Sequence, residues 1–242
     1  MSAVQKPYTI YPLGDTAITL DFGSVIDTAT NKQVLKLFQK LKQLSLPFIS
    51  DVVPAYASLT VYYDVVKVRQ HIDGDTTAAK AIEALVERTY ASLIENVNER
   101  TQYIRVPVCY STNYAPDINA LANAKGLTIE QVIQLHVSQT YRVYMIGFMP
   151  GFAYMGEVSE QLAIPRKAQP CLHVEAGSVG IAGRQTGIYP QASPGGWQII
   201  GRTPLTLFDP HLKTPALFKP GDEVQFYSIT EDEFKSYKSR VA

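Results

Sequence analysis

The stretch 177–204 combines bare glycine backbone with polar and amphipathic side chains, a composition typical of a small-molecule pocket. The side chains in it that could contact a substrate are Ser178, Gln185, Thr186, Tyr189, Trp197 and Arg202. The guanidinium of Arg202 could hold a carboxylate or a phosphate through two parallel hydrogen bonds. The competing structural roles are an ion pair for Arg202 and core packing for Tyr189 and Trp197. Ser178 is not expected to be a nucleophile, because the stretch lacks a G-x-S-x-G elbow.

Two further candidates, His136 and Arg166, lie before this stretch. His136 falls seven residues after Ile129, on the apolar stripe of a predicted helix. A histidine there is either a hydrogen-bonded core residue or a group that handles a proton at a pocket, and we take it with Arg202 as a candidate catalytic residue. Arg166 is a candidate for binding the substrate, whereas the adjacent Lys167 is expected to lie in a solvated loop.

The glycine spacing in 177–204 does not fit the known phosphate-binding loops. A P-loop needs a lysine after its last glycine, and none follows Gly183. A dinucleotide-binding loop needs G-x-G-x-x-G before a helix, which this stretch also lacks. A flexible linker is excluded by the interleaved isoleucine, tyrosine and tryptophan residues. The stretch therefore predicts short strands joined by tight turns.

Composition restricts the class of protein. The chain has 242 residues, 46% of them hydrophobic, with 22 basic and 22 acidic side chains, so a nucleic-acid partner is not expected. It has no apolar run long enough to span a membrane and no secretory signal at its start, so we expect a cytoplasmic protein. Cys109 and Cys171 are expected to be reduced and buried. The spacing of the four histidines and two cysteines predicts no metal site.

The first hundred residues alternate between strand and helix patterns. Strands are predicted at 16–22, 50–56, 58–64 and 102–110, where apolar and polar residues alternate or apolar residues run together. Helices are predicted over 34–44 and 82–94, the second with Thr76 or Thr77 as its N-cap. The order β-α-β-β-α-β matches the ferredoxin-like arrangement of two helices on one face of an antiparallel sheet.

From Tyr141 onward, short apolar runs alternate with Gly, Pro and Ser. The runs predicted as strands lie at 141–148, 178–183, 196–203, 205–208 and 222–229, and such a pattern is typical of a β-barrel or a sandwich. A helix over 128–140, with Thr128 and Gln131 as a capping box, precedes them, and a short helix is predicted at 231–240. The predicted fold class is α+β, with an N-terminal domain at 1–101 and a β-rich domain with a leading helix at 102–242.

Four segments of the chain together resemble the KipI/PxpB family of 5-oxoprolinase B subunits, also called allophanate hydrolase subunit 1. They are GFMPGFAYMG (147–156), PRKAQP (165–170), AGSVGIAGRQTGIYPQASPGGWQIIGRTPLTLFDP (176–210) and KPGDEVQFYSI (219–229). LGDTAITLDFG (13–23) also fits, so the resemblance covers nearly the whole chain. The sequence departs from the usual pattern at Cys171, His173 and Glu175, where the family more often has an arginine, an apolar residue and a proline.

The resemblance implies a small N-terminal α+β domain followed by a cyclophilin-like β-barrel. It implies a hydrolase subunit that opens 5-oxo-L-proline to L-glutamate with ATP, together with a C-type (KipA/PxpC-like) and an A-type (PxpA-like) partner. This chain carries no ATP-binding motif, so the complex rather than the chain alone is expected to bind ATP, and the chain is expected to be inactive without its partners. Two alternatives remain open: a KipI-type inhibitor of a sensor histidine kinase, and the carboxyltransferase half of a biotin-dependent, urea carboxylase-like enzyme.

Overall fold

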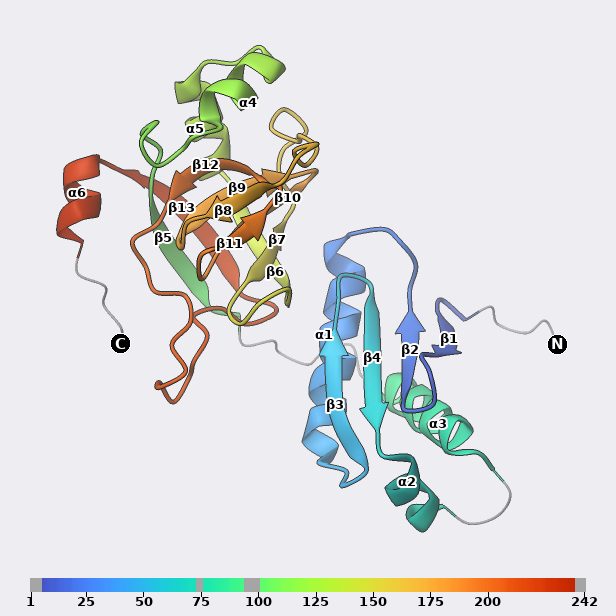
Figure 1. Ribbon diagram of the computed structural model, residues 1–242. Helices are drawn as coiled ribbons and strands as arrows, with labels where there is room; N and C mark the ends of the chain where they lie inside the picture. Colours follow the sequence, from blue (N-terminus) through green and yellow to red (C-terminus); the bar gives the residue numbers. More distant parts are fainter. Residues whose placement is uncertain (1–5, 73–75, 94–100, 238–242) are drawn as a thin grey trace. The chain divides into compact units, whose positions relative to one another are not determined.

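The chain divides into two compact units, residues 1–100 and 101–242. The computed structural model describes residues 6–72, 76–93 and 101–237, and each unit is considered by itself (Figure 1). Among the helices of these residues, none is both long and apolar enough to cross a membrane.

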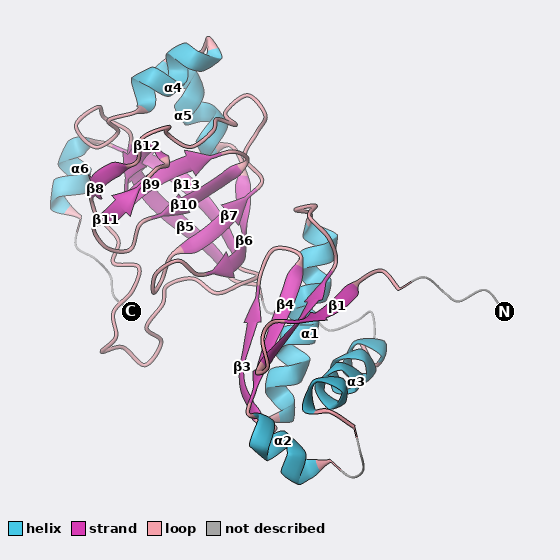
Figure 2. Ribbon diagram, turned by 45° about the vertical axis from the view of Figure 1, so that its right-hand side comes forward, coloured by secondary structure: helices cyan, strands magenta, loops and turns pink. Residues whose placement is uncertain are grey.

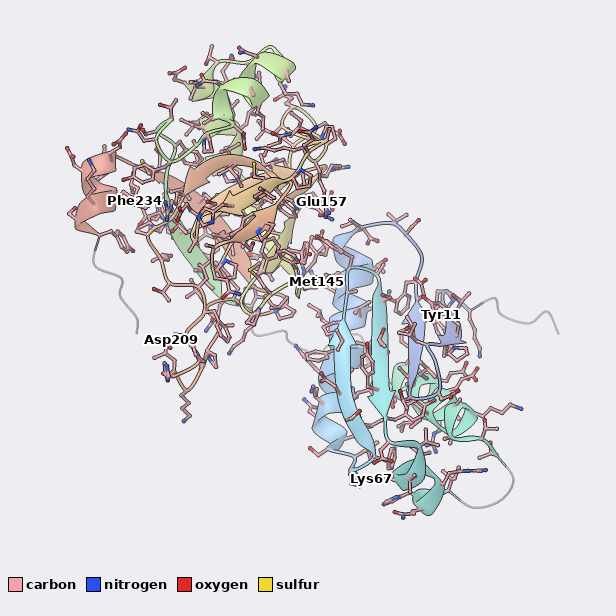
Figure 3. All side chains as sticks on the ribbon, viewed as in Figure 1. Tyr11, Lys67, Met145, Glu157, Asp209 and Phe234 are labelled. Atoms are coloured by element: carbon pink, nitrogen blue, oxygen red, sulfur yellow. The ribbon has the colours of Figure 1, made fainter. Side chains whose placement is uncertain are left out.

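The first unit is a four-stranded antiparallel sheet with helices on one face (Figure 2). Its strands are β1 (Thr9–Pro12), β2 (Ala17–Asp21), β3 (Ile49–Pro54) and β4 (Ser58–Tyr63), in the order β1-β2-β4-β3. Its helices are α1 (Thr28–Leu44), α2 (Val65–His71) and α3 (Ala78–Ala91). Ile18 and Leu59, on neighbouring strands, are buried with Leu37 of α1 and Ile82 of α3. The edge strand β1 leaves Tyr11 exposed on the sheet (Figure 3).

The ferredoxin-like arrangement predicted for this unit is not confirmed. The strand predicted at 102–110 is β5 (Tyr103–Cys109), which belongs to the second unit and pairs there with its last strand. The N-cap prediction is confirmed at Thr77, whose side chain accepts a hydrogen bond from the Lys80 backbone N–H. Helix α3 ends at Ala91, and residue 94, where the predicted helix ends, lies outside the described residues.

The second unit is a closed β-barrel whose strands follow the order β10-β7-β6-β13-β5-β12-β9. With β5, these strands are β6 (Thr140–Ile146), β7 (Ala153–Gly156), β9 (Ser178–Ala182), β10 (Gln185–Ile188), β12 (Gln198–Arg202) and β13 (Glu223–Ile229). Strands β5 and β13 pair in parallel, and the other neighbours are antiparallel. A separate two-stranded ribbon consists of β8 (Cys171–Val174) and β11 (Ser193–Gly195).

Three helices accompany the barrel: α4 (Ile118–Lys125), α5 (Ile129–Val137) and α6 (Glu231–Ser236). Helices α4 and α5 lie together at one end of the barrel (Figure 1). The predicted capping box of α5 is confirmed, because Thr128 and Gln131 exchange side-chain and backbone hydrogen bonds. The prediction of a strand at 205–208 is wrong: this segment makes only an isolated bridge between Phe208 and Ala216.

In the stretch 177–204, glycine is needed at positions such as 177 and 187 because other atoms lie too close to the backbone for a side chain. A Cβ on Gly177, where φ is +81°, would lie 2.3 Å from the carbonyl oxygen of Thr203. A Cβ on Gly187 would lie 2.9 Å from the carbonyl oxygen of Ala153 and 3.1 Å from the ring of Phe152. These distances leave no room for a side chain, so the glycines let the barrel strands and the aromatic rings pack together.

Candidate functional site

Two pockets of the second unit share the segment 166–171 as a wall. The first, here called the aromatic pocket, has a volume of about 230 Å³ and is lined by Phe148, Phe152, Tyr154, Arg166, Pro170, Tyr189, Pro194, Gly195, Gly196 and Trp197. The second, here called the ion-pair pocket, has a volume of about 300 Å³ and is lined by Asn113, Tyr114, Pro116, Lys167, Cys171, His173, Val174, Glu175, Ser178, Ile199 and Arg202. Consecutive residues of the shared segment, such as Arg166 and Lys167, therefore serve different pockets.

The aromatic pocket is built around the buried ring of Phe152. The rings of Phe148, Tyr154, Tyr189 and Trp197 each approach it edge-on, with centroid distances of 4.8–5.5 Å. Edge-to-face packing places the positive edge of one ring against the negative face of another, which favours this arrangement over face-to-face stacking. The result is a preformed apolar wall that could hold the body of a small ligand.

Phe148 stands at the exposed side of this wall. Its side chain is 64% exposed and its backbone has φ of +67°, a left-handed conformation that bulky residues rarely adopt. The turn around it is closed by hydrogen bonds from Met149 N–H to the Gly147 carbonyl and from Phe152 N–H to the Met149 carbonyl. Strained backbone of this kind is concentrated at ligand-binding and active sites, and it marks this pocket as a candidate site.

Arg166 supplies the charge of the aromatic pocket. The residue is exposed, and within the described part of the chain its guanidinium makes no hydrogen bond or ion pair. Burial raises the pKa of the Tyr154 and Tyr189 hydroxyls, and the nearby Arg166 partly offsets that rise. The pocket thus offers an anion a cation that is not already neutralised.

The ion-pair pocket contains a largely buried pair between Lys167 and Asp117. Their Nζ and Oδ2 atoms are 2.7 Å apart, and the two side chains are only 19% and 15% exposed. Lys167 also donates to the sulfur of Cys171 at 3.2 Å, and Asp117 accepts from the Ile199 backbone N–H at 2.7 Å. Burial lowers the pKa of Lys167, but the hydrogen bonds to Asp117 and Cys171 outweigh it, so the pKa is raised overall. The prediction of a solvated Lys167 is therefore wrong.

The two cysteines are both free, as predicted, but they differ in burial. Cys109 is buried in β5, whereas Cys171 is only half-buried at the wall of the ion-pair pocket. Among the described residues, no group of three or more His, Cys, Asp or Glu side chains is placed to hold a metal ion.

Arg202 lies in the ion-pair pocket and is already paired. Its Nε donates to the Ala176 carbonyl at 2.8 Å, and its Nη2 lies 3.2 Å from a carboxylate oxygen of Glu175. The other oxygen of Glu175 is 2.9 Å from Nε2 of His173. The bond to His173, followed by the charge of Arg202, lowers the pKa of Glu175. Arg202 therefore occupies the structural role, an ion pair, that was the alternative to substrate binding.

A braced loop closes one side of the ion-pair pocket. The ring of Tyr114 packs against Phe234 of α6, with centroids 4.3 Å apart and ring planes tilted by 39°. Asn113 donates to the carboxylate of Glu231, also on α6, at 2.9 Å. These contacts fix the loop that carries Tyr114 and Asn113 into the pocket wall.

Ser178 is the buried polar group of the ion-pair pocket, since it is 4% exposed and lines the cavity. Within the described residues its hydroxyl makes no hydrogen bond. Gln185 and Thr186, by contrast, line neither pocket: they lie in β10, and Thr186 is fully buried.

His136 lies in the core of the barrel and lines neither pocket. Its Nδ1 is 2.7 Å from the hydroxyl of Tyr110, and its Nε2 is 3.2 Å from the hydroxyl of Thr186. Because the Thr186 hydroxyl donates to the Gly180 carbonyl, Nε2 must donate to Thr186, and Nδ1 must accept from Tyr110. Burial lowers the pKa of His136 to about 3, so the ring is neutral. This geometry favours the hydrogen-bonded core role over proton transfer to a substrate.

The structure brings the sequence-based candidates together in two groups. Arg166, Tyr189 and Trp197 meet in the aromatic pocket, and Arg202 and Ser178 meet in the ion-pair pocket. Both phenylalanines of the GFMPGF segment (147–152), Phe148 and Phe152, also line the aromatic pocket. Asp117 was missed, because nothing in a turn-rich segment indicates that a carboxylate will meet a lysine fifty residues further on.

Comparison with known proteins places the chain among characterised relatives. The family described as "Carboxyltransferase domain, subdomain C and D" matches residues 8–218. The chain is 39% identical to the 5-oxoprolinase B subunit of Bacillus subtilis over 232 residues, which is 96% of this chain and 97% of the relative. It is 40% identical to the 5-oxoprolinase B subunit of Escherichia coli O157:H7 over 216 residues, covering 89% and 94% of the two chains.

A solved structure agrees with this placement. The crystal structure of TTHA0988 superposes with a TM-score of 0.75 at 35% sequence identity and covers 88% of this chain. This chain spans only 40% of the length of that one, so the larger part of the solved chain lies outside the match.

Proposed function

The chain belongs to the carboxyltransferase subdomain C and D family, the family of the 5-oxoprolinase B subunits, and on that basis we propose that it is the B subunit of an ATP-dependent 5-oxoprolinase. The reaction opens the lactam ring of 5-oxo-L-proline to give L-glutamate. A B-type chain implies partners, and we take these to be the C-type and A-type subunits. The long unmatched part of TTHA0988 supports the expectation that this domain works beside another.

We place the substrate in the aromatic pocket, and the unpaired guanidinium of Arg166 is the observation that carries this assignment. At neutral pH 5-oxoproline has one charge, a carboxylate, on a small five-membered ring. Arg166 can bind that carboxylate through two hydrogen bonds without breaking an ion pair. The ring can then pack against Phe152, Tyr189 and Trp197. In the ion-pair pocket Asp117 and Glu175 already neutralise the two cations, so the single carboxylate of 5-oxoproline would gain less there.

The role of this chain is to bind and orient the substrate. A lactam is unreactive, and ATP, held by the complex rather than by this chain alone, supplies the activation of its carbonyl group. The backbone at Gly195 and Gly196 lacks side chains, so the substrate can approach it closely. In this assignment neither His136, which is buried in the barrel, nor Arg202, which lines the other pocket, touches the substrate.

Three finer expectations from the sequence belong to the same proposal. The barrel is of the cyclophilin-like type, the domains span 1–101 and 102–242, and the enzyme works in the cytoplasm.

Reconstitution tests this function. The chain is co-expressed with its A-type and C-type partners, and ATP-dependent formation of glutamate from 5-oxoproline is measured. We expect turnover by the full complex and none when this chain is omitted. An assembled complex without turnover would contradict the proposal, and inhibition of a sensor histidine kinase by the chain alone would favour the KipI-type alternative.

A further inference from the structure

The ion-pair pocket has the features of a binding site although the proposed substrate does not use it. We propose that it is a second site, which binds an acidic α-amino acid in its zwitterionic form. The choice of L-glutamate as that amino acid rests on the proposed function, because glutamate is the product of the ring opening. The existence of the site and the charge pattern of its ligand rest on the pocket itself.

The hydroxyl of Ser178, in the wall of the ion-pair pocket, forms no hydrogen bond with another described residue. The residue is 96% buried, since only 4% of its surface is exposed, yet its hydroxyl has no hydrogen-bond partner among the described residues. The hydroxyl is not among the buried side-chain atoms that lack a hydrogen bond, so it is open to the cavity and free to bond to a ligand there. Its position in the wall means that a ligand in the cavity can supply the missing bond.

The charges of the pocket require a ligand that carries both signs. The walls hold two cations, Lys167 and Arg202, and their two carboxylate partners, Asp117 and Glu175. A simple anion would be attracted by the cations but repelled by the carboxylates, and a simple cation would meet the opposite problem. An amino-acid zwitterion can place each of its charges beside a group of opposite sign.

Each charged wall group has hydrogen-bonding capacity left for such a ligand. The ammonium of Lys167 has three N–H donors, and only two are taken, by Asp117 and Cys171. The guanidinium of Arg202 has five donors, with bonds at Nε and Nη2 only. Each carboxylate oxygen of Glu175 accepts one hydrogen bond and can accept another.

These capacities match an α-amino dicarboxylate. Its two carboxylates can bind Arg202 and Lys167, one of them also accepting from Ser178, and its ammonium can donate to Glu175. A volume of about 300 Å³ suits a ligand of this size. The substrate 5-oxoproline fits less well, because its nitrogen is an uncharged amide and it has a single carboxylate. The pocket would therefore distinguish the product from the substrate.

Calorimetric titration of the full chain tests this site directly. The ligands are L-glutamate, glutarate, which keeps both carboxylates but lacks the ammonium, and 5-oxo-L-proline. We expect glutamate to bind about tenfold more tightly than glutarate, since a charged hydrogen bond is lost in the latter. Glu175→Gln should weaken glutamate binding about tenfold without weakening glutarate binding, and Ser178→Ala should weaken both several-fold. The matched control Arg166→Gln, in the other pocket, should leave glutamate affinity unchanged.

A second measurement needs no variant and so does not depend on their folding. Cys171 lines the ion-pair pocket whereas Cys109 is buried, so alkylation by iodoacetamide, followed by mass spectrometry, should report on Cys171. Bound glutamate should slow alkylation of Cys171, and glutarate at the same concentration should slow it less.

Three outcomes would overturn the proposal. These are equal affinity for glutamate and glutarate, no binding at millimolar glutamate, and an alkylation rate of Cys171 that glutamate does not lower. Neither measurement involves turnover, so a failure of the second-site proposal can be distinguished from a failure of the proposed function. Glutamate binding without 5-oxoproline turnover in the complex would refute the proposed function and leave the second site in place.

Discussion

The two pockets share one wall but differ in the state of their charges. In the aromatic pocket a single guanidinium, that of Arg166, stands beside five aromatic rings without a carboxylate partner among the described residues. In the ion-pair pocket Lys167 and Arg202 are both neutralised by neighbouring carboxylates. The difference teaches that the number of cations in a pocket does not identify an anion site. What matters is whether a neighbouring carboxylate already neutralises the cation.

The strongest test of this comparison is removal of the unpaired cation. In the reconstituted complex, Arg166→Gln should raise the KM for 5-oxoproline about fiftyfold, because a charged bidentate hydrogen bond of about 2–3 kcal/mol is lost. Arg202→Gln is the matched control and should change KM less than about threefold. Steady-state kinetics at varied 5-oxoproline concentration measures the KM of both variants. A larger increase of KM in Arg202→Gln would place the substrate in the ion-pair pocket instead.

The fit of the aromatic wall can be tested at two adjacent glycines. A Cβ on Gly195 would lie 2.4 Å from the Tyr189 hydroxyl, whereas a Cβ on Gly196 would come no closer than 3.7 Å to its neighbours. Gly195→Ala should therefore lower the free energy of unfolding by about 2 kcal/mol through overpacking. Gly196→Ala should change it by less than about 0.5 kcal/mol. Denaturant unfolding of both variants measures the difference, and equal stability would show that Tyr189 can move aside.

The free energy of unfolding should depend on pH through His136, which is buried in the barrel. Its pKa is about 3 in the folded chain and about 6.5 when unfolded, so the unfolded chain binds the proton first as pH falls. The part of the free energy of unfolding that comes from this pKa difference is fully present above pH 6.5. It is lost as the pH falls from 6.5 to 3. At pH 5 the loss should be about 2 kcal/mol.

Urea unfolding at about pH 7.5 and about pH 5 measures this loss. The difference between the two pH values should shrink by about 2 kcal/mol in His136→Gln and stay unchanged in the control His211→Gln, at an exposed position. Ligand affinities of both pockets should not follow the His136 titration. A KM that did follow it would make this histidine a catalytic candidate again.

The smallest expected effect concerns the partly buried ion pair. Asp117→Asn leaves the ammonium of Lys167 without its carboxylate and should lower the free energy of unfolding by about 1 kcal/mol. Asp51→Asn breaks a surface pair with Lys42, in which the lysine and aspartate side chains are 51% and 57% exposed, and should cost about 0–0.5 kcal/mol. Thermal unfolding of the two variants provides the comparison. Equal losses would mean that burial adds nothing to the pair in the pocket.

Local signals explain how much of the fold was predictable from the sequence. The capping box at Thr128 and Gln131 located α5, and the turn residues between apolar runs located most barrel strands, because these signals involve neighbours in the chain. The partner of β5 could not be predicted, since β13 follows more than a hundred residues later. Helix α4 was missed for a different reason. It has only eight residues, fewer than the roughly 11–18 over which helical periodicity is recognised.

The site was predictable in its residue types but not in its pairings. Arg166 and Arg202 were both anion-binding candidates for the same chemical reason. Only the fold shows that Glu175 neutralises Arg202 while Arg166 has no partner in the described residues. Arg166 and Lys167 are neighbours in the chain but line different pockets. Which pocket each one faces depends on the path of the backbone, which the composition of the segment does not reveal.

The parallel pairing of β5 with β13 has a consequence for synthesis of the chain on the ribosome. The first strand of the barrel leaves the ribosome early, but its neighbour β13 comes almost last. The first unit is a compact unit within residues 1–100, so it can fold while translation continues. The barrel cannot close until translation is nearly finished, so the edges of β5 and β6 stay unpaired during that interval. This nascent stage is where chaperones would be needed to prevent aggregation.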